Sequence, residues 1–218
     1  MAINKKQSSL WVKIVLIFVI IAFVATLVPA LFMGGGGAQQ PAGATETGAT
    51  LERIANDHLP AVNSYTAMLA SEPTSYTALV GLGNTYFDWG FQIQQALGPN
   101  SGHDMAYWVS ATTAYERALA EQAGDPNVAV DMAIAYFYSG QASRAIEVAE
   151  QVMADSPEFA PAYFNGGIFY RAVGRTDDAV AAFTRYLEIE PDGQSASAAQ
   201  SILSEIAATP SGEATTTP

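Results

Sequence analysis

The sequence predicts an all-α protein: an α-solenoid of stacked helix pairs, with about three repeats and flanking helices, behind a single N-terminal transmembrane helix. Three observations lead to this prediction. Residues 14–33 form a long uncharged apolar run, and small and aromatic residues recur at a period of 34 between residues 126 and 193. Segments rich in Gly, Ala and Thr lie between the apolar run and the repeats and again at the C-terminal end.

The apolar run has the length of a bilayer span. It holds 20 residues without a charge, and 14 of them are Ile, Leu, Val or Phe. At a rise of about 1.5 Å per residue it covers about 30 Å, the thickness of the hydrocarbon core. A cleaved signal peptide is the competing interpretation, but its apolar region is shorter, and the best cleavage site here, at Val28-Pro29-Ala30, falls inside the run. We therefore prefer a retained transmembrane helix at 14–33.

The charge distribution predicts the orientation. All three lysines, Lys5, Lys6 and Lys13, lie before the span, and no Lys or Arg follows it until Arg53. The positive-inside rule then places residues 1–13 in the cytoplasm and the rest outside it, as a single-pass protein of the cytoplasmic (inner) membrane. Residues 34–49 and 209–218 have too little apolar surface to fold, so we expect a flexible linker and a disordered tail.

The body of the protein is acidic. From residue 14 on, six arginines stand against 21 acidic residues, which leaves a net charge of −15. Such a surface repels nucleic acids, so we expect no nucleic-acid partner. The chain has no cysteine, which excludes disulfides, thiol catalysis and thiolate metal sites.

The repeat signal predicts antiparallel helix pairs. Pro126 opens a first helix over 126–139, Gly140 ends it, and a return helix over 141–155 stops at Ser156-Pro157. The recurring residues are Ala133, Tyr136, Gly140, Ala145, Ala149 and Pro157, which return 34 positions later as Gly167, Tyr170, Gly174, Ala179, Phe183 and Pro191.

Residues 162–192 resemble a tetratricopeptide repeat. They carry Tyr163, the pair Gly166-Gly167, Tyr170, Gly174, Ala179, Phe183 and Pro191 at the family's spacings. Residues 126–159 form a weaker copy, because Ala129 and Ala149 replace bulky residues. A further copy starts near Tyr76, on the pattern Leu79, Leu82-Gly83, Tyr86 and Gly90.

The resemblance covers about 50–208. It divides into repeats at 76–125, 126–159 and 160–193 and a capping helix at 195–207, which would use one face made of Ala198, Ile202, Leu203 and Ile206. Upstream, residues 59–69 followed by Pro73 resemble the second helix of a degenerate repeat.

The first repeat holds 19 extra residues between Gly90 and Ala114. We expect residues 91–97 to extend the first helix, residues 98–102 to form a tight loop, and Asp104 to cap a lengthened return helix. This hairpin would carry Phe91, Ile93, Met105, Tyr107 and Trp108. Its aromatic side chains either pack inside the protein, or form a partner-specific contact surface made of Phe91, Ile93, Tyr107 and Trp108.

The resemblance implies a concave groove, lined by the first helix of each repeat, that binds other proteins. The implied contact residues are Val80, Asn84, Phe87, Asp88, Val130, Ile134, Phe137, Tyr138, Phe164, Ile168 and Arg171. This set is mostly apolar and lies in an acidic chain, so it suits an apolar or basic segment of a partner protein. The family's clamp for a terminal carboxylate needs lysines that are absent after Lys13. The alternative to an open groove is that the capping helix or the 91–108 hairpin covers part of it.

No motif points to catalysis. His58 and His103 are the only histidines, each in a polar context typical of a turn or a helix start, and no second ligand accompanies either. Asp177 and Asp178 follow Thr176 at a helix start, where carboxylates complement the helix dipole. We predict that the chain is not an enzyme and has no catalytic, cofactor or metal site.

The predicted function is that of a membrane-anchored extracytoplasmic scaffold or adaptor for protein–protein interaction. Two alternatives stay open: a non-catalytic subunit of a larger membrane complex, and a periplasmic holdase-type chaperone that aids secretion or envelope or cytochrome assembly. Partner identity and oligomeric state do not follow from the sequence.

Overall fold

The computed structural model describes residues 42–208. The predicted cytoplasmic segment at 1–13, the transmembrane helix at 14–33 and the tail at 209–218 lie outside these residues. The chain divides into two units, Met1–Thr45 and Glu46–Pro218, and the second holds the repeats. Within residues 42–208, no helix combines the length and the apolarity needed to cross a membrane.

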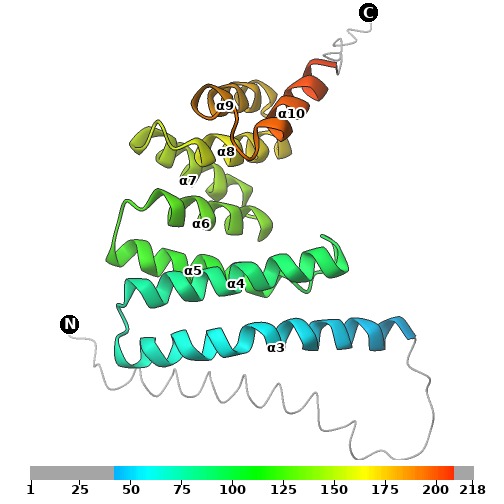
Figure 1. Cartoon of the computed structure of the whole chain (residues 1–218), viewed down its shortest axis with the longest axis vertical. Coiled ribbons are helices and arrows are strands. Elements are labelled where there is room, and N and C mark those ends of the chain that lie inside the picture. The colour runs from blue at the N-terminus through cyan, green and yellow to red at the C-terminus, as the bar shows by residue number, and fades with distance from the viewer. Residues whose placement is uncertain (1–41, 209–218) are drawn as a thin grey trace, which may run out of the picture. The chain divides into compact units, whose positions relative to one another are not determined.

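The described residues form an all-α solenoid of eight helices without a strand. Three antiparallel pairs, α4/α5, α6/α7 and α8/α9, follow one another, with α3 before them and α10 after them (Figure 1). The bounds are α3 Ala42–Ser71, α4 Tyr76–Leu97, α5 Met105–Glu121, α6 Pro126–Tyr138, α7 Ala142–Asp155, α8 Ala160–Ala172, α9 Thr176–Ile189 and α10 Ala196–Ala208. The predicted fold class is confirmed for this part of the chain.

Local sequence explains the ends of α6. The Asp125 carboxylate accepts hydrogen bonds from the backbone N–H groups of Asn127 and Val128, at 3.0 and 3.4 Å, so it caps the helix that Pro126 opens. At the other end, Gly140 adopts a positive φ of 79°, and the chain then turns into α7. Gly174 repeats this geometry after α8 with the same φ of 79°, because a glycine tolerates the left-handed conformation that closes a helix.

Glycines let the two helices of a pair approach closely. A Cβ atom added to Gly83 of α4 would lie 2.5 Å from the ring of Tyr115, and one added to Gly167 of α8 would lie 2.8 Å from the ring of Phe183. Both rings are buried. The small residues that marked the repeat in the sequence therefore make room for an aromatic side chain of the partner helix.

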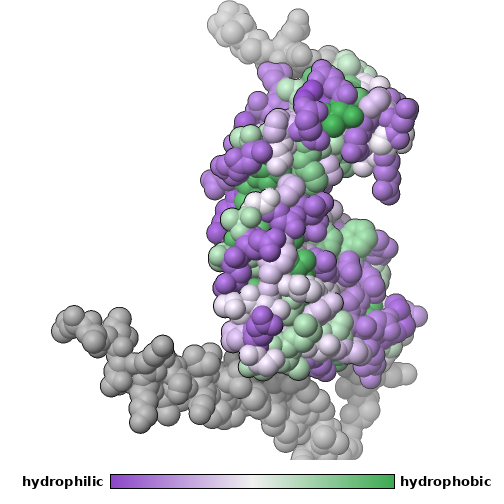
Figure 2. Space-filling model, turned by 60° about the vertical axis from the view of Figure 1, so that its left-hand side comes forward, coloured by the Kyte–Doolittle hydropathy of each residue, from purple (hydrophilic) through white to green (hydrophobic). Residues whose placement is uncertain are grey.

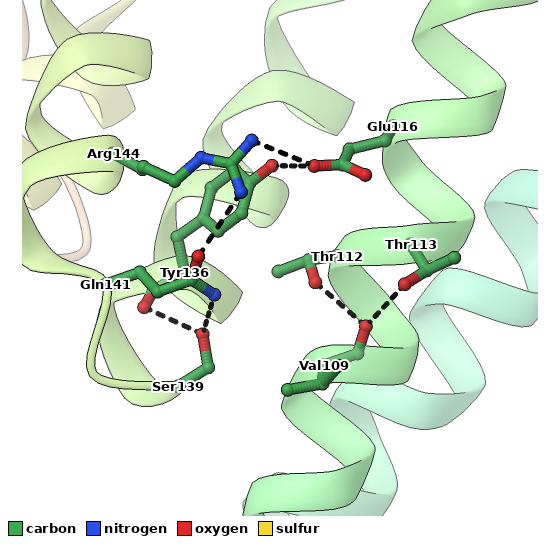
Figure 3. Close-up of polar contacts among 8 residues, drawn as sticks. All are labelled: Val109, Thr112, Thr113, Glu116, Tyr136, Ser139, Gln141 and Arg144. Atoms are coloured by element: carbon green, nitrogen blue, oxygen red, sulfur yellow. Dashed lines mark hydrogen bonds and ion pairs between the residues drawn. The ribbon is translucent and has the colours of Figure 1, made fainter.

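Successive pairs are joined by a polar network, which Figure 3 shows. The Tyr136 hydroxyl of α6 donates to the carboxylate of Glu116 on α5. Arg144 of α7 lies 3.3 Å from the same carboxylate, and its guanidinium sits 4.4 Å from the centre of the Tyr136 ring. On α5, the hydroxyls of Thr112 and Thr113 both donate to the carbonyl of Val109.

The network recurs 34 residues later. The Tyr170 hydroxyl donates to Glu150 at 2.9 Å, and an arginine again covers the tyrosine ring at 4.4 Å. That arginine is Arg175, which is not the sequence counterpart of Arg144. The tyrosine and glutamate thus follow the repeat, whereas the arginine reaches the same place from a different position.

The structure differs from the predicted linker at residues 42–49, which form the first turns of α3. The segment contains three alanines, which favour a helix, but also two glycines, which disfavour one, so helix propensity alone does not account for the extension. The predicted helix at 59–69 is the C-terminal part of this 30-residue helix, which continues through Pro60. Ile54 of α3 is buried against Trp89 and Ile93 of α4.

The insertion forms the predicted hairpin. Helix α4 runs to Leu97, α5 starts at Met105, and Gly98 and Gly102 of the loop have positive φ angles of 85° and 72°. The predicted cap is wrong, since the Asp104 side chain makes no capping bond. Its carboxylate accepts the indole N–H of Trp108 instead.

The predicted face of the capping helix α10 is confirmed in part, and Ala198 is the exception. Ala196 and Ala199 are buried, whereas Ala198 is exposed. Ile202 and Leu203 pack against the core as expected. Just before the helix, the Ser195 backbone N–H donates to the Tyr186 hydroxyl at 3.1 Å.

Candidate protein-binding surface

The predicted contact residues lie on α4, α6 and α8, the first helix of each pair. Val130 is an exception to the prediction: it is only 4% exposed and packs against Val152 and Ala162, so it belongs to the core and cannot contact a partner. We call the remaining set the first-helix face. Its members are Val80, Asn84, Phe87, Asp88, Ile134, Phe137, Tyr138, Phe164, Ile168 and Arg171, all half-buried or exposed.

Ring contacts connect this face across the repeats. Phe87 meets Trp108 edge-on at 5.2 Å between ring centres, and Trp108 stacks on Tyr138 at 4.8 Å. Tyr138 contacts Phe137, which stacks on Phe169 of α8 at 4.9 Å. The half-exposed aromatic side chains therefore form one chain from the first pair to the third, and buried rings of the core hold them in place.

The hairpin residues divide into core and surface. Ile93 and Trp108 are 1% and 0% exposed, so for these two residues internal packing, and not contact with a partner, is the correct alternative. Tyr107 is half-buried and stacks on Trp89 at 4.4 Å. Phe91 and Met105 are 41% and 45% exposed. Internal packing thus explains most of the aromatic side chains of the insertion.

Two carboxylates lie on the helices α4 and α6 that carry this face. Asp88 is exposed on α4, one turn after Asn84, and Asp131 is half-buried on α6. Burial, together with the negative charges of Asp125 and Asp88, raises the pKa of Asp131 to about 6. Burial and the carboxylates of Asp131 and Asp88 also raise the pKa of Tyr115, whose hydroxyl donates to the Asn84 side chain at 2.8 Å.

The sequence prediction missed Asp131. Asp131 follows Val130 and lies between the positions that the resemblance implies for ligand contact, so it was not selected. The sequence nevertheless held a signal for it. Asp131 is the only charged residue among the 13 residues of α6. A lone carboxylate in an otherwise apolar helix that packs on both sides carries a desolvation cost, which marks it as a candidate for function.

The third repeat is partly covered by the capping helix. Arg171 forms an ion pair with Glu205 of α10 at 2.8 Å. Phe164 packs on Phe183 and Tyr186 at 5.7 and 5.3 Å between ring centres. Arg171 is therefore engaged within the chain, which leaves α4 and α6 as the main candidates for a contact surface.

The histidines have no metal-binding surroundings. His58 lies inside α3 and is 7% exposed, not at a turn or a helix start, and its Nδ1 atom is 2.9 Å from the Ile54 carbonyl oxygen. Its ring stacks on Trp89 at 5.4 Å, so it is part of the α3–α4 contact. His103 is exposed in the hairpin loop. Across residues 42–208, no group of three or more His, Cys, Asp or Glu side chains is arranged to hold a metal ion.

On the face that Figure 2 displays, hydrophilic residues cover most of the described surface, and apolar residues show between them as separate green patches. A mostly polar exterior with limited apolar areas is usual for a folded protein.

Comparisons with known proteins agree with the repeat architecture. A profile of the tetratricopeptide repeat family matches residues 136–206, whereas none of the curated proteins matches the chain. A tetratricopeptide repeat protein from Parabacteroides merdae superimposes with a TM-score of 0.52 at 19% identity, over 73% of this chain and 60% of that one. The first such domain of Spaghetti (RPAP3), solved with an HSP90 peptide, has a TM-score of 0.49 at 21% identity, over 61% of this chain and 90% of that one.

At these identities the solved structures show the fold alone. The family match covers the second helix pair from Tyr136 onward, the third pair and most of α10. Residues 136–206 therefore match the tetratricopeptide repeat family.

Proposed function

We propose that this chain is a scaffold that holds an apolar segment of another protein on the first-helix face, and that the segment carries a lysine or arginine next to its apolar residues. Tetratricopeptide repeats generally mediate protein–protein interaction, and their fold is typically non-catalytic. The single observation that carries the proposal is the aromatic chain from Phe87 to Phe137 beside the carboxylates of Asp88 and Asp131.

Charge complementarity supports the choice of partner. With a pKa of about 6, Asp131 is mostly ionised at neutral pH. Among the described residues, five of the six arginines form ion pairs: Arg53, Arg144, Arg171, Arg175 and Arg185. None of these ion pairs involves Asp88 or Asp131. Arg117 donates to the carbonyl of Pro73. A cation supplied by the partner would relieve the repulsion between these carboxylates, and the aromatic chain would bury the apolar residues beside it.

We also propose that residues 14–33 anchor the scaffold in the cytoplasmic membrane with the repeats outside the cytoplasm. This part of the proposal rests on the apolar run and the flanking lysines. External protease added to spheroplasts should remove the repeats while an epitope before Lys5 stays protected. Cleavage of the repeats only after the membrane is permeabilised would overturn the orientation.

The binding proposal is tested by photo-crosslinking in cells. A benzoylphenylalanine at Phe137 or Phe164 of the full chain should capture a defined segment, whose sequence, read by mass spectrometry, has a Lys or Arg within a few residues of the attachment point. Ala181, exposed on α9, is the matched control and should capture nothing. The pair of substitutions Asp88→Asn and Asp131→Asn should lower the yield about tenfold.

The captured material also separates the alternatives. One stoichiometric integral-membrane protein indicates a subunit of a membrane complex, and many unfolded proteins without a shared basic position indicate a holdase. An unchanged yield in the double variant, or equal capture from Ala181, contradicts the proposed surface.

A further inference from the structure

A second apolar site lies away from the first-helix face. It is a pocket of about 240 Å³ between the α5–α6 connection and the second half of α7. Its floor and walls are mostly aliphatic, from Leu119, Ala129, Met132, Val148 and Val152, and its rim is polar, from Asp125, Gln151, Asp155 and Ser156.

The pocket exists because one side chain of the repeat is missing. Ala129 holds the position that Leu79 holds in the first repeat and Tyr163 in the third. Leu79 is completely buried. Tyr163 packs against the core, and the Arg185 guanidinium lies 5.9 Å from the centre of its ring.

The register of this contact identifies the space. Arg185 lies 34 residues after Gln151, and Gln151 lines the pocket together with Ala129. Tyr163 and Arg185, which lie against each other in the third repeat, are therefore the counterparts of Ala129 and Gln151, which line the pocket in the second. The pocket is the place of an aromatic ring that the second repeat does not supply.

We propose that this pocket binds an aromatic side chain, Phe or Tyr, of a partner protein. Its volume suffices, because an apolar cavity of about 150 Å³ already accepts benzene and stays empty of water. The aliphatic lining provides apolar contact for a ring. Burying such an anchor is what gives protein interfaces much of their energy.

The rim sets the charge of the segment around the anchor. The Asp155 carboxylate accepts the Gln151 amide at 2.7 Å, and the Asp125 carboxylate accepts the Tyr76 hydroxyl at 2.8 Å. The hydrogen bond from Tyr76 lowers the pKa of Asp125, so this carboxylate is ionised at neutral pH. A segment with a carboxylate beside its aromatic anchor is repelled, and a neutral or basic one is accepted.

The first test uses p-cresol, the tyrosine side chain as a free molecule. The full chain, reconstituted in nanodiscs and labelled with ¹³C at its methionine methyl groups, reports binding through Met132, which lines the pocket. The chemical shift of Met132 should change saturably with p-cresol concentration. The shifts of Met68 and Met105, which are 42% and 45% exposed, should show only the non-saturable change caused by p-cresol that partitions into the lipid.

Substitution of Ala129→Tyr is the decisive variant. The third repeat shows that a tyrosine fits at this position, so the variant should fold and bind p-cresol at least about tenfold more weakly. Ala129→Leu, which copies Leu79 of the first repeat, is a second filler of the same space if the tyrosine variant does not fold. Equal saturable shifts at Met132 in wild type and in a folded filled variant would overturn the proposal, as would no saturable shift in wild type.

The second test distinguishes a protein side chain from a free small molecule. A photo-crosslinker at Gln151, on the rim, should capture a protein in cells, and Ala129→Tyr should abolish this adduct. Adducts from Phe137 should persist in the same variant, because the first-helix face is separate, so failure of one site does not imply failure of the other. Absence of any protein adduct from Gln151 rejects a partner side chain as the occupant.

Discussion

The indole N–H of Trp108 donates to the carboxylate of Asp104 at 3.0 Å, and both side chains are buried, at 0% and 5% exposure. The two residues lie on one turn at the start of α5, so the hydrogen bond holds the indole ring against Gly90 of α4. A Cβ atom at Gly90 would lie 3.0 Å from that ring. The hydrogen bond thus orients the indole within the hairpin, and the ring then packs against α4 at Gly90.

Asp104→Ala should lower the free energy of unfolding by about 1–3 kcal/mol, because it leaves the buried indole N–H without an acceptor. Asp104→Asn keeps an acceptor oxygen and should cost less. Denaturant unfolding followed by tryptophan fluorescence measures both, and Asp57→Asn on the exposed side of α3 serves as the control. Equal losses for Ala and Asn would show that the hydrogen bond is not the cause.

Gly83→Ala and Gly167→Ala should each destabilise the fold by about 1–3 kcal/mol, because the added methyl group meets the ring of Tyr115 or Phe183 at less than 3 Å. Gly48→Ala is the matched control. Its Cβ meets nothing within 4 Å, and it lies inside α3, so it should stabilise the protein by about 0.5–1 kcal/mol. Thermal unfolding by circular dichroism gives the order of the three variants, and an unaltered midpoint for Gly167→Ala would refute the close approach.

Asp131→Asn should stabilise the protein at pH 7 by about 1–2 kcal/mol, since it removes a partly buried carboxylate that lies near two others. In the folded state the pKa of Asp131 lies near 6, above its ordinary value of 3.8. The folded protein therefore binds more protons between these two values. Stability from this residue is complete below about pH 4 and is lost as the pH rises through about 6.

The measurement is the difference in unfolding free energy between wild type and Asp131→Asn from about pH 4 to about pH 8. This difference should grow across that window and then level off. The contributions of the other carboxylates are the same in both proteins and therefore cancel. A constant difference would mean that the pKa of Asp131 is not raised. Because the same carboxylate is proposed to bind a cation of the partner, the variant should be more stable and bind more weakly.

Tyr170→Phe should cost about 0.5–1.5 kcal/mol through loss of the hydrogen bond from its hydroxyl to Glu150. Arg175→Gln should cost less, because its ion pairs with Glu150 and Asp178 are largely exposed. Both are read from chemical unfolding curves. A larger loss for the arginine variant would place the energy of the network in the ion pairs and not in the tyrosine.

Much of the fold follows from the 34-residue register. Pro126, Gly140 and Gly174 act through backbone geometry that their own residue type imposes, so the ends of α6, α7 and α8 were predictable to within about two residues. Local chemistry also predicted the hairpin, because glycines favour a tight turn, and Gly98 and Gly102 indeed have positive φ angles. The linker prediction failed over 42–49, where α3 extends without any repeat signal in the sequence to show it.

Which side chains face a partner depended on distant contacts. The register alone could not separate Val130, which is buried, from Ile134, nor assign Trp108 to the core, because the helix that covers each of them is remote in the sequence. The sequence by itself determined the helix pairs, their boundaries and the acidic charge, since these depend on neighbours along the chain. Only the tertiary structure decided that Asp131 is half-buried near other carboxylates and that Ala129 opens a pocket, because burial and empty space are properties of packed helices and not of any one segment.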